Sequence, residues 1–208
     1  MTIHEAIRAR RTLRDFENRP VDRATLERIV EAGLQAPSND HLRSWEFIVV
    51  DTPAERLRLL AEIRQEFPAA DVAAWLDGWR STDPLQRAMY LDGVPKQHRM
   101  LLTAGTLLLP CFRQPHPLLQ PASQSDLNGF ASIWCCIENM LLAAAAEGIG
   151  GVTRIPFPRE SIHLKRVLSI PADYEVACYL ALGYPAPEAS HPRQHAPAAA
   201  ERIRIGHW

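Results

Sequence analysis

The sequence lacks the features that mark membrane, secreted and nucleic-acid-binding proteins. Among its 208 residues, 23 lysines and arginines nearly balance 24 aspartates and glutamates, for a net charge of −1. This balance argues against a general nucleic-acid or anionic-membrane surface. The longest apolar stretch, residues 130–146, is interrupted by Glu138 and Asn139, so we expect no transmembrane segment. The charged residues 1–14 contain no apolar signal-peptide core.

Cysteine is scarce, and its spacing does not suit a metal site. The four cysteines are Cys111, Cys135, Cys136 and Cys178. None forms a CxxC pair, and two adjacent cysteines are poor zinc ligands. We therefore expect no metal site and interpret all four as buried thiols in a reducing cytoplasm. The chain also has no GxSxG, HExxH or P-loop motif, which leaves nucleophilic hydrolysis, zinc proteolysis and P-loop chemistry without their usual residues.

Hydrophobic periodicity and capping residues predict one domain over residues 1–208, of the α+β class. Helices are expected from Thr2 to about Arg10, from Asp22 toward Pro37, after Thr52, and over residues 125–147 and 161–168. Strands are expected over residues 45–50, 100–112 and 175–183. Helices and strands are mixed without a regular βαβ alternation, which favours an α+β sandwich over a doubly wound sheet.

Three further segments bear on how such a domain is organised. Residues 68–95 have a weak period and carry Trp75 and Trp79. We interpret them as an irregular insertion with short helices, either a candidate lid or a surface subdomain with its own aromatic cluster. The helix expected over 125–147 is apolar nearly all round, as a helix buried at a subunit interface would be. Residues 185–208 contain four prolines and are expected to form an extended arm.

Arginines are concentrated near the start of the chain. Arg8, Arg10, Arg11 and Arg14 occur within seven residues, with Thr12 among them. Guanidinium groups this close repel one another unless an anion or acidic partners neutralise them. The planar fork of arginine matches a phosphate group. The alternative is that these cations complement a helix C-terminus and nearby carboxylates.

Two other stretches carry residues suited to a ligand. Residues 36–45 (APSNDHLRSW) are dense in side chains that hydrogen-bond in turns. They either present donors and acceptors to a planar polar ligand or form an ordinary connecting loop. Gly148, Gly150 and Gly151 either let the backbone approach a ligand closely or end a helix. They follow a predicted helix rather than precede one, so they are no dinucleotide fingerprint.

Together these motifs resemble the nitroreductase family. Residues 10–16 (RRTLRDF) with Pro20-Val21 are similar to its opening RRS-x-R-x-F…PV, and residues 36–45 to its APS-x-x-N-x-QPW-x-F. Residues 147–150 (EGIG), 170–171 (IP) and 181–185 (ALGYP) are similar to its GLG…iP…alGyP ending. The motifs occur in the family's order and spacing, whereas residues 64–95 are not covered. The resemblance implies a mixed, mainly antiparallel sheet flanked by helices, and an intertwined homodimer with FMN at the interface.

The resemblance also assigns roles to individual residues. The FMN phosphate and ribityl chain would be held by Arg10, Arg11, Thr12 and Arg14, with Arg193 as a late basic ligand and Gly151 in the glycine motif. The isoalloxazine and ribityl chain of the partner's cofactor would meet Pro37, Ser38, Asn39 and His41. The pyrimidine ring would meet Lys96 and Arg99. A cation there would favour reduced flavin, which carries negative charge at that edge.

The sequence departs from the family pattern at two places. His41 stands where the family usually has Asn, and Arg43-Ser44 where it has Gln-Pro; a histidine in that position would make the contact to FMN depend on pH. Many members offer a backbone N–H to flavin N5 shortly after the glycines. One alignment places Pro156 there, which has no N–H; otherwise a neighbour such as Ile155 is the donor.

The resulting functional hypothesis is an FMN-dependent NAD(P)H oxidoreductase of the cytoplasm. NAD(P)H would deliver hydride to the flavin and leave, and a nitroaromatic, quinone or enone acceptor would then bind in its place. The protein would need no catalytic side chain of its own, because the flavin supplies the chemistry. The alternatives are a flavin-based reductive dehalogenase or flavin-fragmenting enzyme of the same fold, and a non-catalytic FMN-binding protein. Nucleic acid and membrane are not expected partners.

Overall fold

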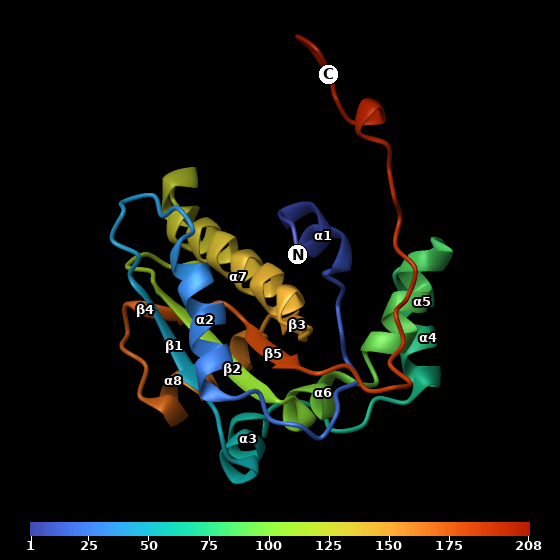
Figure 1. Ribbon diagram of the computed structural model, residues 1–208, viewed down its shortest axis with the longest axis horizontal. Coiled ribbons are helices and arrows are strands. Elements are labelled where there is room, and N and C mark those ends of the chain that lie inside the picture. Colours follow the sequence, from blue (N-terminus) through green and yellow to red (C-terminus); the bar gives the residue numbers. More distant parts are fainter.

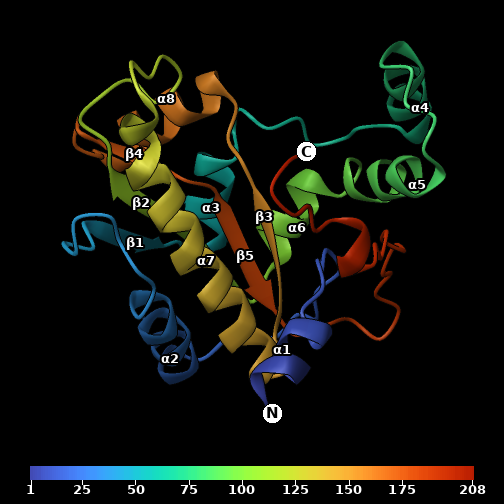
Figure 2. The ribbon, with the colours of Figure 1, turned by 90° about the horizontal axis from the view of Figure 1, so that it is seen from above.

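A five-stranded sheet lies between two layers of helices in the computed structural model, which describes residues 1–208 (Figures 1 and 2). Its strands are β1 (Trp45–Val49), β2 (Thr106–Arg113), β3 (Gly150–Arg154), β4 (Tyr174–Val176) and β5 (Tyr179–Gly183). The order is β1-β2-β5-β3, with β4 also paired to β2, and all of these pairings are antiparallel. The predicted α+β fold with a mainly antiparallel sheet is therefore confirmed.

The helices divide between the two faces of the sheet (Figure 2). One face carries α2 (Arg23–Leu34) and α7 (Asn128–Ala146), with α1 (Ile3–Ala9) beside α7. The other face carries α3 (Pro53–Leu59), α6 (Gln97–Thr103) and α8 (Pro158–Leu168). Alternate residues of β2 point to opposite faces, so Leu108 joins the α2–α7 core, whereas Leu107 and Leu109 join the core under α3, α6 and α8.

Local signals in the sequence place several helix ends correctly. The side chains of Thr2 and Glu5 form a capping box at the start of α1, and those of Thr52 and Glu55 form one at the start of α3. Asp22 caps α2 by accepting the N–H of Thr25 at 2.9 Å. These contacts satisfy backbone N–H groups that have no partner within the helix.

The prediction of one strand over residues 100–112 is wrong in its first part. Residues up to Thr103 belong to α6, which starts at Gln97, and the strand starts only at Thr106. The apolar run is buried in both elements, so hydrophobicity alone does not distinguish them. The buried side chain of Arg56 donates to the carbonyls of Leu102 and Ala104, which satisfies the C-terminal end of the helix.

The strand predicted over residues 175–183 is interrupted. In the register with β2, Cys111 opposes Val176 and Leu108 opposes Leu180. Residues 177–179 thus oppose only residues 109 and 110 of β2, which is the geometry of a β-bulge. One of the two opposing residues is Pro110, which has no N–H to donate to the ladder. Its carbonyl instead accepts the N–H of Ala177 at 2.9 Å.

Strand β3 begins within the glycine motif, at Gly150, and the sequence did not predict it. Glycine is depleted in strands, so Gly150 and Gly151 hide the strand in the sequence. Tertiary packing accounts for them. A Cβ on Gly151 would lie 2.7 Å from methyl groups of Leu141 and Leu182, closer than van der Waals contact permits. With glycine at this position, β3 pairs with β5 under α7 without displacing these leucine side chains.

Helix α7 crosses one face of the sheet, with Ile133, Ile137 and Met140 buried. Together with the preceding 3₁₀ turn, residues 124–146 are long and apolar enough to cross a membrane by length and composition alone; a core helix meets the same criteria. Within this single chain the outer side of α7 remains uncovered. Cys135 is exposed there, so the prediction that all four cysteines are buried is wrong at this position.

The short helices expected within residues 68–95 are α4 (Ala69–Gly78) and α5 (Pro84–Gly93), which project to one side of the sheet as a hairpin (Figure 2). A small separate core of Val72, Leu76 and Val94 holds them together. The C-terminal residues pass α5 and then extend away from the rest of the molecule (Figure 1). They contain one 3₁₀ turn, Ala199–Glu201.

Candidate functional site

The outer edge of β3 organises the candidate site. The N–H of Leu13 donates to the carbonyl of Gly151 at 3.0 Å, and Thr12 and Gly151 form an isolated parallel β-bridge. The arginine-bearing segment after α1 therefore runs along the edge of β3 that β5 does not occupy. A Cβ on Gly150 would lie 2.7 Å from Cβ of Leu13, so glycine at this position allows the close approach.

A cavity of about 250 Å³ opens at the start of this edge. Its polar lining consists of Arg10, Arg11 and His191, with the glycines of residues 148–151 forming the backbone wall, and no carboxylate contributes. The Nε atom of Arg10 lies 3.4 Å from the half-exposed carboxylate of Glu138 on α7. Arg11 has no ion pair and donates to the carbonyl of Arg10. This cavity therefore offers an anion the guanidinium groups of two arginines and a glycine backbone that it can approach closely.

A second, smaller cavity of about 150 Å³ lies farther along the same strand. Val152, Thr153 and Arg154 of β3 line it together with Arg14, and α5 and α6 supply the opposite wall, including Tyr90, Gly93 and Gln97. The first cavity is lined by Gly150 and Gly151 and the second by the three residues that follow them in β3, so the two cavities lie one after the other along the strand. Arg14 is largely buried, and burial lowers the pKa of its guanidinium against the opposing effect of Asp92 and Asp15.

Lys96 and Arg99 do not line either cavity. The ammonium of Lys96 donates to Asp15 and Asp92, each at 2.6 Å, and Arg99 donates to Asp15 at 2.7 Å. Asp92 also lies 3.5 Å from Arg14. Burial lowers the pKa of Lys96, but the hydrogen bonds to the two carboxylates outweigh it and hold that pKa above its ordinary value. The cations expected at the pyrimidine ring thus form one ionic cluster with Arg14.

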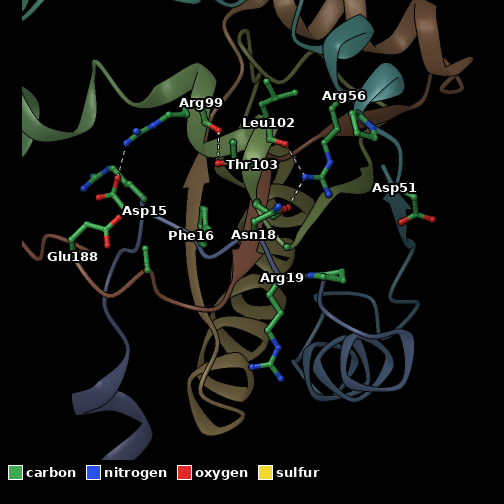
Figure 3. Close-up of a pocket in the computed structure, with 16 residues that line it drawn as sticks. Asp15, Phe16, Asn18, Arg19, Asp51, Arg56, Arg99, Leu102, Thr103 and Glu188 are labelled. Atoms are coloured by element: carbon green, nitrogen blue, oxygen red, sulfur yellow. Dashed lines mark hydrogen bonds and ion pairs between the residues drawn. The ribbon is translucent and has the colours of Figure 1, made fainter.

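A third cavity, of about 480 Å³, is also lined by Arg14, and Figure 3 shows other residues that line it. Figure 3 shows Arg99 and Asp15 facing one another, as their ion pair requires, and Arg19 directed away from Arg56. Arg19 stacks on the ring of Tyr184, with 3.6 Å between its guanidinium carbon and the ring centroid. Asp15, Asp51 and Glu188 also line this cavity. Its arginines already have partners and its lining contains acids, so it suits a phosphate less well than the cavity at Arg10.

The 37–41 segment lies elsewhere in the same chain. The N–H of Asn39 donates to Oγ of Ser132 at 3.3 Å, near the start of α7. The cavity with Arg10 is lined by Ala145, near the end of that helix. Thirteen residues of helix separate these points, about 20 Å at 1.5 Å per residue. The single chain therefore does not bring the 37–41 segment to Arg10.

Three of the four candidate residues in this segment lie at the surface. Ser38 is buried and accepts the N–H of Arg43, whereas Pro37, Asn39 and His41 are exposed. His41 has a φ of 58°, which is uncommon for a residue other than glycine and is tolerated best by Asn, Asp and His. Its side chain makes none of the hydrogen bonds of the segment.

The C-terminal arm reaches the first cavity through a different residue than expected. Arg193 lines neither of the two cavities along β3, whereas His191 lines the one with Arg10 and Arg11. Sequence reasoning also missed Gln97 and Arg154 at the second cavity. Arg154 comes shortly after the glycines, but nothing in the sequence around this single arginine indicates that its side chain is buried.

Comparison with known proteins identifies the fold and the family. The nitroreductase family model matches residues 7–184. The chain belongs to the nitroreductase family. Its solved relatives include an FMN-dependent nitroreductase from Clostridium difficile, with a TM-score of 0.67, 18% identity and coverage of 98% of both chains. At that identity the likeness shows the fold alone.

Among curated relatives, this nitroreductase-family chain is similar to proteins of more than one activity. It is 29% identical over 182 residues to a 5,6-dimethylbenzimidazole synthase from Rhodobacter capsulatus, covering 87% of this chain and 82% of that protein. It is 27% identical over 185 residues to an iodotyrosine deiodinase from Haliscomenobacter hydrossis, covering 88% and 79%. Family membership therefore does not by itself select the reaction.

Proposed function

We propose that this chain is an FMN-dependent NAD(P)H oxidoreductase that reduces a nitroaromatic, quinone or enone acceptor by ping-pong hydride transfer in the cytoplasm. The observation that carries the proposal is the pair of cavities along β3, with Arg11, which has no ion pair, and partly buried Arg10 at one end and Arg14 at the other. Membership of the nitroreductase family, and a fold shared with a protein described as FMN-dependent, support the choice of cofactor.

The residues present fit FMN. The cavity lined by Arg10, Arg11 and His191 without any carboxylate suits the phosphate, because charge-assisted hydrogen bonds from arginine contribute about 1.5–3 kcal/mol each. The cavity beside Arg14 suits the ring system, so Arg14 would contact the ring and not, as expected from the sequence, the phosphate and ribityl chain; Thr12 with Gly151 lies between the two cavities. When bound, FMN would supply the hydride acceptor and donor chemistry.

The side chains around the ring-end cavity would adjust its electrostatics. Arg14, Lys96 and Arg99 carry three positive charges against the two of Asp15 and Asp92, so the cluster is net cationic. Placed beside a ring that becomes negative on reduction, it would stabilise the reduced form more than the oxidised form. Lys96 and Arg99 would act through this cluster, and Arg14 would make the direct contact.

We also propose that the functional unit is a homodimer with FMN at the interface. Pro37, Asn39 and His41 are exposed and lie about 20 Å along α7 from Arg10 in the same chain, so a second copy would have to bring them to this cofactor. The uncovered side of α7, with Cys135, offers a surface for that contact. Arg193 on the extended arm would act only if the arm moves or crosses to the partner.

The experiment that tests the proposed function is anaerobic reduction of the purified protein. A yellow, FMN-loaded protein whose flavin absorbance bleaches with NAD(P)H and returns with a nitroaromatic or quinone would support the proposal. A colourless protein that does not bind added FMN would contradict it. Bound FMN that NAD(P)H does not bleach would indicate the non-catalytic carrier instead.

The similarity to a deiodinase and to 5,6-dimethylbenzimidazole synthase supports a second candidate, in which reduced flavin removes a halogen or is itself broken down. The two outcomes are separable on the same preparation. Chemically reduced protein is mixed either with a halogenated phenol or with oxygen, and halide release or loss of flavin is measured. An NAD(P)H oxidoreductase is expected neither to release halide nor to lose its flavin.

A further inference from the structure

A buried ion pair joins the end of β3 to the start of α8. The guanidinium of Arg154 contacts the carboxylate of Glu160 through two hydrogen bonds, Nη1 to Oε2 at 2.5 Å and Nη2 to Oε1 at 2.9 Å. The side chains are only 8% and 3% exposed. Glu160 also accepts the N–H of Phe157 at 3.1 Å, and Nε of Arg154 donates to Gln97 on α6 at 3.0 Å. Three elements therefore meet at one guanidinium.

Stability alone does not explain such a pair. Removing two charges from water costs about as much as their attraction returns, so well-packed apolar side chains of similar volume are often equally stabilising. What a bidentate pair adds is direction, because the planar guanidinium accepts only a narrow range of geometries. Here it fixes where the last residue of β3 lies relative to α6 and α8.

The backbone that follows Arg154 faces the candidate cofactor site. The carbonyl of Gly151 points to the free edge of β3, where it accepts from Leu13. Residues two apart in a strand direct their backbone groups to the same edge, so Thr153 and then Ile155 point toward the cavity of about 150 Å³ that Thr153 lines. The N–H of Ile155 makes none of the chain's turn and loop hydrogen bonds, and Pro156 has no N–H.

We propose that Arg154 and Glu160 are positioning residues that hold the Ile155 N–H at the ring-end cavity and thereby raise the reduction potential of bound FMN. This rests on the proposed function. A donor held rigidly beside a group that becomes negative stabilises the reduced state, whereas a mobile donor must first be ordered. Arg154 also lines this cavity, but its guanidinium is bound to Glu160 and Gln97, so the pair would act through the backbone that follows it.

The test compares the midpoint potential of bound FMN, measured by reductive titration against a reference dye, in wild type and two variants. In the first, Arg154→Met is combined with Glu160→Met, which removes both charges while keeping the core filled. The second, Arg154→Lys, keeps the charge but loses the planar two-bond geometry. We expect both to bind FMN and both potentials to become more negative, the double variant by about 30 mV, a tenfold change for a two-electron couple.

The control is Lys165→Met with Glu175→Met, which removes another ion pair of α8, with 2.8 Å between its charged atoms and no side-chain hydrogen bond to β3. Its potential should match that of wild type. If either Arg154 variant is folded by circular dichroism, retains FMN and has the wild-type potential, the positioning role is wrong although the proposed function stands. A wild-type protein that binds no FMN would instead remove the proposed function.

Discussion

The N–H of Leu13 donates to the carbonyl of Gly151 over 3.0 Å, and this one bond fixes the arginine-bearing segment against β3. It places Arg10 and Arg11 at one cavity and Arg14 at the next. The side chain of Leu13 is buried, so the segment is anchored by packing as well as by the hydrogen bond. The proposed cofactor site therefore depends on close contact between a loop and a glycine-containing strand.

Adding a methyl group at Gly150 should separate this contact. In Gly150→Ala the new Cβ would lie 2.7 Å from Cβ of Leu13, so the segment has to move; overpacking of this kind costs about 1–3 kcal/mol. We expect a lower thermal midpoint and weaker FMN binding, measured by fluorescence titration. Gly78→Ala is the control, since a Cβ there meets nothing within 4 Å. Equal FMN affinity in both variants would show that the segment does not position the cofactor.

Arg10 and Arg11 should each contribute to FMN retention. Replacement by alanine removes a charge-assisted hydrogen bond of about 1.5–3 kcal/mol, which corresponds to roughly a 10- to 150-fold rise in the dissociation constant at 1.4 kcal/mol per tenfold. Arg8→Ala is the matched control, because Arg8 is exposed on α1 and lines neither of the two cavities along β3. An Arg10→Ala protein that holds stoichiometric FMN with unchanged affinity would overturn the phosphate assignment.

Thiol reactivity should report whether α7 forms the proposed dimer interface. Burial raises the pKa of Cys111 and of Cys136 to about 12, and Cys178 is fully buried, so these three thiols should not react in the folded protein. Cys135 is exposed in the single chain. We expect it to be protected in the native dimer and labelled after dissociation, with oligomeric state checked by sedimentation. Rapid labelling of an intact dimer would exclude this part of α7 from the interface.

His98 should make the protein less stable in mild acid. Burial lowers its pKa below the ordinary value of 6.5, so the unfolded chain binds a proton more readily. Its contribution is fully favourable above about pH 6.5 and is lost as the pH falls from there through the folded-state pKa. We expect the unfolding free energy of wild type, relative to His98→Leu, to decrease over that range. The exposed His4→Leu serves as control, and a constant difference would contradict the shift.

Much of this protein was determined locally by its sequence. The capping residues at Thr2, Asp22 and Thr52 act within one helical turn, and the structure shows each of them in place. The motifs at Arg10–Phe16 and Gly148–Gly151 placed the chain in its family for the same reason, since they are short runs of contiguous residues. The fold class followed from the hydrophobic periodicity, which is helical in some segments and strand-like in others.

Tertiary structure decided what depends on distant neighbours. Leu13, Leu141 and Leu182 pack so closely on Gly150 and Gly151 that this strand contains glycine, a residue depleted in strands, and residues 100–103 form a helix although their hydrophobicity equally suits a strand. Asp15 and Asp92 draw Lys96 and Arg99 into one ionic cluster. The partnership of Arg154 with Glu160 exists only once β3 and α8 meet, because a charge is stable in a core only beside its counter-charge.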